Sequence, residues 1–146
     1  MKSSENQVEL SDAPVLGFAS FRFVVGVNFL MHGAVRVFGD YAGFVSWVTK
    51  TFEGTILSGG LAGAYGWAIP LIELILGVLL ISGLGTKWTL VAGELFMATL
   101  IVGMTLKQNW DTVAFQMIYA ISLYLLLLNI RYNHLSLDYL LFRQTE

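Results

Sequence analysis

Four long apolar runs are the feature of this sequence that most constrains its fold. They cover residues 15–38, 61–83, 86–106 and 112–130. Each has roughly the 20 residues that an α-helix needs to cross the hydrocarbon core of a bilayer. The composition agrees: 56% of the residues are hydrophobic, 12% are charged and the mean hydropathy is +0.71, which is above the usual range of soluble domains. Residues 1–146 are therefore predicted to form a single transmembrane domain, an all-α integral membrane four-helix bundle.

The connectors between these runs are short, except for the first, which covers residues 39–60. Its first half places Phe44, Val48 and Phe52 four residues apart, so they share one stripe of a helix. We expect a short interfacial helix here, lying on the bilayer surface between the first two spans. The second half is rich in glycine, and both a flexible link and a cap over a cavity are consistent with it.

The hairpin SGLGT between the second and third runs fixes part of the topology. It is too short to cross the bilayer between the two helices, so the second helix must run back beside the first as its antiparallel neighbour. One helix is predicted to end at Gly83, and Thr86 is predicted to cap the next. A small excess of Lys and Arg on one side of the spans places both termini in the cytoplasm.

Several kinds of chemistry are excluded by composition. The chain has no cysteine, so it forms no disulfide and carries no thiol redox pair or iron–sulfur ligand. A net charge of −2 without a basic patch argues against a nucleic-acid partner. His32 and His134 are predicted on opposite sides of the membrane, so a haem with two axial imidazoles is not expected. Glu73 and Glu94 have no His or Asp at ligand spacing, so no metal site is predicted.

The first apolar run carries an unusual set of polar side chains. Asn28, His32 and Arg36 recur every four residues and share one helix face, and Arg22 lies about 40° beyond Arg36 around the helix. Charged groups in a membrane are rare and usually face the bundle interior or a water-filled cavity. Arg36 is near the end of its run, which favours snorkelling to the lipid headgroups. For His32, a packing role and a ligand-contacting role both remain open.

Glu73 and Glu94 are candidate partners for Arg22. All three residues are predicted at a similar depth, ~10–15 Å from one end of their spans. A guanidinium or carboxylate alone at that depth is costly, whereas a pair is tolerated. We therefore expect Arg22 to face the interior and to bond Glu73, Glu94 or both, within a polar network that includes Asn28. A structural staple is the favoured role, and a proton relay through Glu73 is the alternative.

Three motifs carry a resemblance to a known family. The segment RFVVGVNFLMHGAVRVFG resembles the first helix of DoxX-family proteins, with matching positions at Arg22, Gly26, Phe29, His32, Gly33, Arg36, Phe38 and Gly39. The segment IELILGVLLISGLGTKWTLVAG is similar to a second signature of that family, matched at Glu73, Gly77, Gly83, Leu84, Thr86 and Lys87. The segment HLSLDYLL resembles a common family ending, with Leu135 where a Trp is often found.

The resemblance implies a protein of the bacterial cytoplasmic membrane that is associated with redox work. The related DoxD type is a subunit of thiosulfate:quinone oxidoreductase, and other members are associated with thiol-linked oxidative-stress complexes. Because this chain has no cysteine, catalysis by the chain alone is not expected, and its status as an enzyme stays open.

Two function classes remain. One is a redox subunit that binds a quinone or a small sulfur compound at a site formed by His32, Arg36, Tyr65, Trp67 and Gln116. The other is a non-catalytic accessory or assembly subunit that docks to other membrane proteins of a larger complex.

Overall fold

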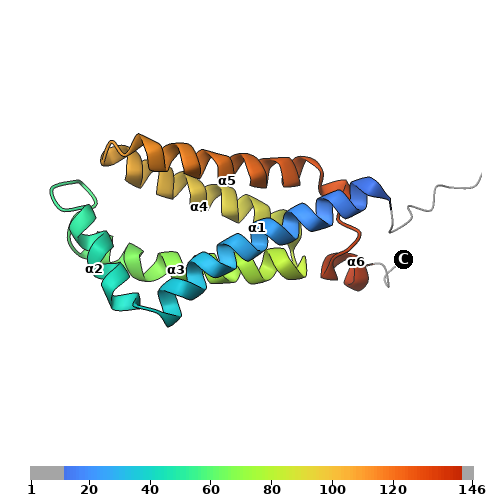
Figure 1. The fold of residues 1–146 in the computed structure, drawn as a ribbon, viewed down its shortest axis with the longest axis horizontal. Coiled ribbons are helices and arrows are strands. Elements are labelled where there is room, and N and C mark those ends of the chain that lie inside the picture. Colours follow the sequence, from blue (N-terminus) through green and yellow to red (C-terminus); the bar gives the residue numbers. More distant parts are fainter. Residues whose placement is uncertain (1–11, 143–146) are drawn as a thin grey trace, which may run out of the picture.

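The structure is a computed structural model that describes residues 12–142, and most of these residues are helical (Figure 1). The elements in chain order are α1 (Ala13–Phe38), α2 (Tyr41–Thr51), α3 (Gly60–Ser82), α4 (Thr86–Leu106), α5 (Trp110–Leu128), the 3-10 segment η1 (Ile130–Tyr132) and α6 (Leu137–Phe142). The positions predicted for the two chain termini lie outside the described residues.

Helices α1, α3, α4 and α5 are long and apolar enough to cross a membrane. The predicted four-helix architecture is confirmed, and each helix begins and ends within two residues of its predicted limits. The helix predicted in the first connector is also present, as α2. The sequence did not predict η1 and α6.

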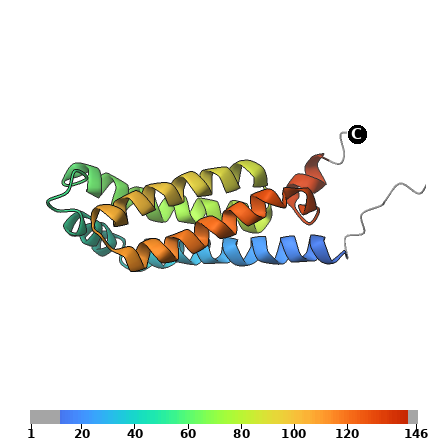
Figure 2. The ribbon, with the colours of Figure 1, turned by 90° about the horizontal axis from the view of Figure 1, so that it is seen from above.

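The four long helices lie side by side and enclose one elongated core (Figures 1 and 2). One end of the bundle holds α2, and we call it the α2 end. The opposite end holds the α3–α4 turn at residues 83–85 together with η1 and α6, and we call it the turn end. The two ends differ in how they bind a buried arginine of α1 and in the space around it.

Helices α1 and α3 pack closely because glycines line their contact. A Cβ atom added to Gly26 would lie 2.9 Å from the backbone nitrogen of Ile81, and one added to Gly33 would lie 2.6 Å from the carbonyl oxygen of Pro70. Such small residues let two membrane helices approach backbone to backbone. They also fix the register of α1 against α3, and with it the groups that each polar side chain of α1 can reach.

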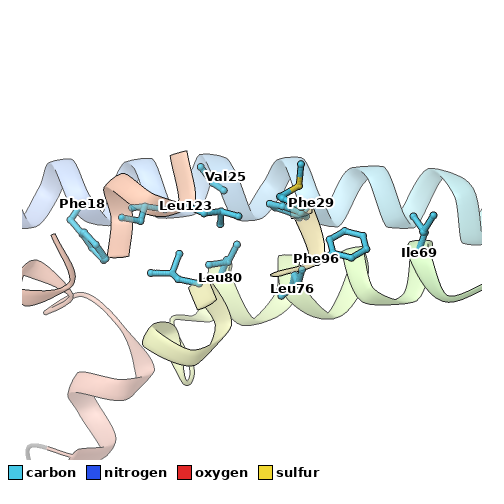
Figure 3. Close-up of a cluster of buried hydrophobic side chains, with 11 residues drawn as sticks. Phe18, Val25, Phe29, Ile69, Leu76, Leu80, Phe96 and Leu123 are labelled. Atoms are coloured by element: carbon cyan, nitrogen blue, oxygen red, sulfur yellow. The ribbon is translucent and has the colours of Figure 1, made fainter. Parts of the chain in front are cut away.

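The core runs along this contact (Figure 3), and buried side chains of α4 and α5 complete it. It contains buried side chains from all four long helices, including Phe18, Val25, Phe29, Ile69, Leu76, Leu80, Phe96 and Leu123. Many other large apolar side chains, such as Val35, Leu95 and Phe115, are exposed. In water that surface would be unfavourable, whereas in a bilayer it is the face that contacts lipid.

Helix α2 covers one end of the bundle with the stripe that the sequence indicates. Val48 and Phe52 are buried and pack with Ala62 of α3. A Cβ atom on Gly103 of α4 would lie 3.1 Å from the Phe52 ring, so the glycine leaves room for that ring. The stripe therefore packs on the bundle, and Phe52 fills the space between α3 and α4 at this end.

At the turn end, Arg22 binds the backbone rather than a carboxylate. Its guanidinium donates hydrogen bonds to the carbonyl oxygens of Leu80, of Ile81 at 3.2 Å and of Leu135 at 2.6 Å. Only 4% of Arg22 is exposed, so the predicted inward orientation is confirmed. The predicted pairing of Arg22 with Glu73 or Glu94 is wrong.

The direction of helical side chains explains this difference. Side chains of a helix point toward its N-terminus, so Arg22 reaches toward the turn end and away from the middle of α3. There it meets the last turn of α3, where carbonyl groups lack partners inside their own helix. Those carbonyls supply the acceptors that the sequence led us to expect from carboxylates.

Asp138 completes the turn end. Its carboxylate accepts hydrogen bonds from the backbone N–H groups of Gly85, at 2.6 Å, and Thr86, at 2.7 Å. Gly83 has a φ of +68° and ends α3 as predicted. The cap predicted from Thr86 is wrong, because the N-cap position is Gly85 and the acceptor comes from Asp138, on α6.

Candidate functional site

A polar cavity lies within the bundle near the α2 end. It consists of two adjoining spaces of about 240 Å³ and about 170 Å³. The two spaces share five lining residues, Arg36, Glu73, Leu100, Thr112 and Gln116. We call them together the ion-pair cavity. All four long helices line it, and α2 closes the smaller space.

The ion pair of Arg36 and Glu73 lies in the wall that the two spaces share. One nitrogen of the Arg36 guanidinium donates to both carboxylate oxygens of Glu73. The side chain of Arg36 is 29% exposed and that of Glu73 is 7% exposed. The predicted snorkelling of Arg36 to the headgroups is therefore wrong. Its side chain points back along α1, toward the segment of α3 that Gly33 holds close, and there it meets Glu73.

The Arg36 guanidinium also contacts an aromatic ring. Phe44 of α2 lies with its ring centroid 4.7 Å from Cζ of Arg36, a distance at which a cation is attracted to the face of a ring. The Phe44 ring stacks in turn on Trp47, with centroids 5.8 Å apart. Arg36 is thus held by a carboxylate from α3 and an aromatic ring from α2.

This arrangement makes the cavity electrically balanced. A guanidinium and a carboxylate in direct contact compensate each other's charge, which makes their burial tolerable. Most of the remaining wall is apolar and includes Phe29, Met97 and Leu100. The cavity therefore favours a ligand that is uncharged overall and has a few polar atoms.

Gln116 of α5 supplies a polar group without a partner in the protein. Its Oε1 atom is buried, and within residues 12–142 no hydrogen bond reaches it. Buried amide oxygens are nearly always hydrogen-bonded, because an unmade bond there costs about 1–3 kcal/mol. Gln116 lines both spaces of the cavity, so its side chain forms part of the wall that they share.

Asn28 and His32 lie on the same wall as Arg36, as their four-residue spacing predicts. The His32 imidazole lies edge-on to the ring of Tyr119, with centroids 6.3 Å apart and an interplanar angle of 75°. His32 is exposed on its outer side. It therefore stands at the rim of the cavity between α1 and α5, where it can contact a ligand.

Of the other two predicted ligand-binding residues, Tyr65 lies at the cavity and Trp67 does not. Tyr65 lines the smaller space, and its hydroxyl is hydrogen-bonded to Oγ1 of Thr99 on α4. Trp67 does not line the cavity; its side chain is 49% exposed and packs on Tyr41, with ring centroids 4.4 Å apart. Of the predicted polar network, Glu73 and Asn28 reach the cavity, whereas Arg22 belongs to the turn end.

Glu94 stands apart from both arginines. It is half-buried on α4, and its Oε1 atom is buried without a hydrogen-bond partner among the described residues. His134 lies at the turn end, with its ring 4.8 Å from that of Tyr139. About 25 Å of α1 separates the level of Val15, which shares a surface hollow with His134, from that of His32. The two imidazoles therefore cannot face one iron.

Most of the apolar wall of the site was not predicted from the sequence, and neither were Phe44, Trp47 and Thr112. The stripe that predicted α2 already contained Phe44, and it could have indicated an aromatic ring over the end of the first span. Nothing in the sequence around Thr112 distinguishes it from an ordinary residue in the first turn of a helix.

Comparison with known families agrees with this architecture. The model of the DoxX family matches residues 17–106, which is more than half of the chain. The chain belongs to the DoxX family. No curated protein and no solved structure matches it. Within this DoxX-family chain, the match includes Arg36 and Glu73, whereas Thr112 and Gln116 lie beyond it.

Proposed function

We propose that this protein is a subunit of a redox system in the bacterial cytoplasmic membrane and binds the headgroup of a quinone in the ion-pair cavity. The observation that carries the proposal is a charge-balanced cavity between four helices long enough to span a membrane, lined by the side chains of Asn28, His32 and Gln116. The DoxX resemblance supports the redox context, because the related DoxD type is a subunit of a quinone-linked oxidoreductase.

The chemistry of a quinone matches the wall of this cavity. The headgroup is flat and uncharged, and its two carbonyl groups only accept hydrogen bonds. The imidazole of His32 and the amides of Asn28 and Gln116 each offer N–H donors to such acceptors. The larger space, about 240 Å³, is below the ~300–1,000 Å³ typical of sites for drug-sized ligands, so it suits a headgroup of one or two rings.

The same observations disfavour a small sulfur anion as the ligand. An anion needs uncompensated positive charge, and the charge of Arg36 is already compensated by Glu73. Displacing Glu73 would leave a carboxylate buried without a partner, which is strongly unfavourable. Since the chain also lacks cysteine, any thiol step of the redox system would take place on another subunit.

The test is binding of a tailless quinone to the purified protein. We would reconstitute it in nanodiscs of phosphatidylethanolamine and phosphatidylglycerol and measure binding of menadione and of the tailless ubiquinone headgroup. Gln116→Leu should weaken binding about tenfold, because it removes a polar contact at nearly constant volume. Met117→Leu is the matched control on the neighbouring, lipid-facing position. If neither quinone binds, or if Gln116→Leu binds as the parent does, the proposal is wrong.

A non-catalytic accessory or assembly subunit is the second candidate. The observation in its favour is that the Arg36–Glu73 pair joins α1 to α3 without any ligand, as a purely structural staple would. Native purification in mild detergent separates the two candidates. An accessory subunit would co-migrate with a larger membrane complex and contain no quinone, and Gln116→Leu would leave that complex intact and active.

A further inference from the structure

A large apolar groove lies on the outside of the bundle between α3 and α4. Its volume is about 500 Å³. Its lining residues are Phe52, Leu57, Leu61, Ala62, Tyr65, Leu95, Ala98, Thr99 and Val102. Leu61, Leu95 and Val102 are all more than half exposed, so the groove opens toward the surrounding lipid.

The groove contains few polar atoms, and the two side-chain hydroxyls in it satisfy each other. Tyr65 from α3 and Thr99 from α4 are hydrogen-bonded through their hydroxyl groups, and Thr99 also donates to the carbonyl oxygen of Phe96 at 2.7 Å. With these groups paired, the groove offers a ligand apolar contact only. It therefore fits a hydrocarbon chain and not a polar headgroup.

The groove and the ion-pair cavity have two walls in common. Phe52 and Tyr65 line both the groove and the smaller space of the cavity. On one side of these two side chains lie Arg36, Glu73 and Gln116, and on the other side lies the apolar groove. Helices α3 and α4 meet at the turn end and separate toward the α2 end (Figure 1), which is where this boundary lies.

From this adjacency we propose that the groove holds the isoprenoid tail of the quinone, which passes between α3 and α4 when the side chains of Phe52 and Tyr65 at the boundary move aside. The inference rests on the proposed function, since it extends a headgroup site into a site for the whole molecule. Head and tail then meet surfaces of matching polarity: the headgroup meets the polar cavity and the tail meets the apolar groove. The route also lets the ligand enter sideways from the bilayer without crossing water.

The groove can be filled without touching the headgroup site. Ala98 lines the groove but not the ion-pair cavity, and it is exposed to lipid. Ala98→Phe would therefore occupy the groove at little risk to folding, and Val102→Trp gives a second, independent filling. Ala92→Phe is the matched control, because Ala92 is exposed on the same helix and does not line the groove.

The experiment compares ligands that share a headgroup but differ in the tail. Menadione is compared with phylloquinone, and the tailless ubiquinone headgroup with decylubiquinone, in the same nanodiscs, with concentrations expressed per mole of lipid. We expect both groove-filling variants to bind the tailed quinones about tenfold more weakly. Their binding of the tailless quinones should stay at the parent level, and Ala92→Phe should leave all four ligands unaffected.

The outcomes separate the tail assignment from the proposed function. If the parent binds tailless quinones and the groove-filling variants bind every ligand as the parent does, the headgroup site stands and the tail assignment is wrong. The tail assignment is equally wrong if the variants weaken tailed and tailless quinones to the same extent, or if they displace a co-purified phospholipid and no quinone. If the parent binds neither kind of quinone, the proposed function fails, and the tail assignment fails with it.

Discussion

The two ends of the bundle each bury an arginine from the same helix, and they satisfy it in opposite ways. At the turn end, Arg22 donates to three backbone carbonyls. At the α2 end, Arg36 is held by one side-chain carboxylate, and the space around the pair is hollow. Backbone acceptors are present whatever the side chains are, whereas Glu73 has to be placed there by the sequence.

The surroundings of each arginine follow the same division. At the turn end, Asp138 and Asn133 make further hydrogen bonds, to the backbone of Gly85 and Thr86 and to the Thr86 hydroxyl. Both ends leave buried polar atoms without a partner within residues 12–142, namely Nε of Arg22, Oδ1 of Asn133 and Nδ1 of His134 at the turn end and Oε1 of Gln116 at the α2 end. The ends differ in the space around these groups, because the cavity lined by all four long helices lies near the α2 end. For this reason we propose ligand binding at the α2 end.

The largest expected effect is the loss of stability on replacing Arg22. Arg22→Leu would leave three carbonyls at the end of the bundle without their donor. We expect the free energy of unfolding to fall by about 3 kcal/mol or more, because bonds to a charged group are worth ~1.5–3 kcal/mol each. Denaturant titration in mixed micelles measures this. A change below about 0.5 kcal/mol, the usual limit for an inconsequential surface substitution, would contradict the structural role of the turn end.

The next effect tests whether the charges of Arg36 and Glu73 can both be removed without unfolding the protein. Arg36→Leu alone leaves Glu73 without a partner and should cost about 2 kcal/mol, less than the ~3–5 kcal/mol of fully buried pairs because Arg36 is 29% exposed. The double variant Arg36→Leu with Glu73→Leu should recover most of that stability and still lose quinone binding. Unfolding and menadione binding are measured on the same samples. If the double variant still binds menadione, the ion pair takes no part in ligand binding.

These two cases show what could be predicted from the sequence and what could not. The four spans and α2 follow from length, hydropathy and spacing, which are local properties. The face shared by Asn28, His32 and Arg36 follows from helical geometry alone. Pairing between helices does not, because it depends on the register that Gly26 and Gly33 impose on α1 and α3.

Depth along the membrane is therefore an insufficient guide to partners. Arg22 and Glu73 lie at similar distances from the ends of their helices, but their side chains extend in opposite directions along the bundle, since α1 and α3 are antiparallel. The acceptors of Arg22 could not be predicted either, because no residue type indicates a free backbone carbonyl. Asp138 was missed for a related reason: α6 is a six-residue helix, too short to produce a periodic pattern.

A smaller effect comes from the same substitution made at both ends. Asp138→Asn should cost about 1 kcal/mol, because its two carboxylate oxygens each accept a backbone N–H and an amide keeps only one acceptor. Asp40→Asn is the matched control at the α2 end, where a single oxygen accepts from Gly43, and Asn caps helices as well as Asp does. Both variants are compared by denaturant titration. Equal losses would mean that Asp138 acts as an ordinary cap.

The smallest expected effect belongs to Glu94, the carboxylate that neither arginine binds. Its Oε1 atom is buried without a partner among the described residues, so replacing the carboxylate by an amide breaks no contact of that atom. Glu94→Gln should therefore change the free energy of unfolding by less than about 0.5 kcal/mol, and binding of menadione should stay at the parent level. Glu73→Gln is the comparison, since it weakens a real ion pair and should lower both stability and binding. If Glu94→Gln destabilises the protein as strongly as Glu73→Gln does, Glu94 has a charged partner. The comparison of the two ends would then have to include a third polar contact, on α4.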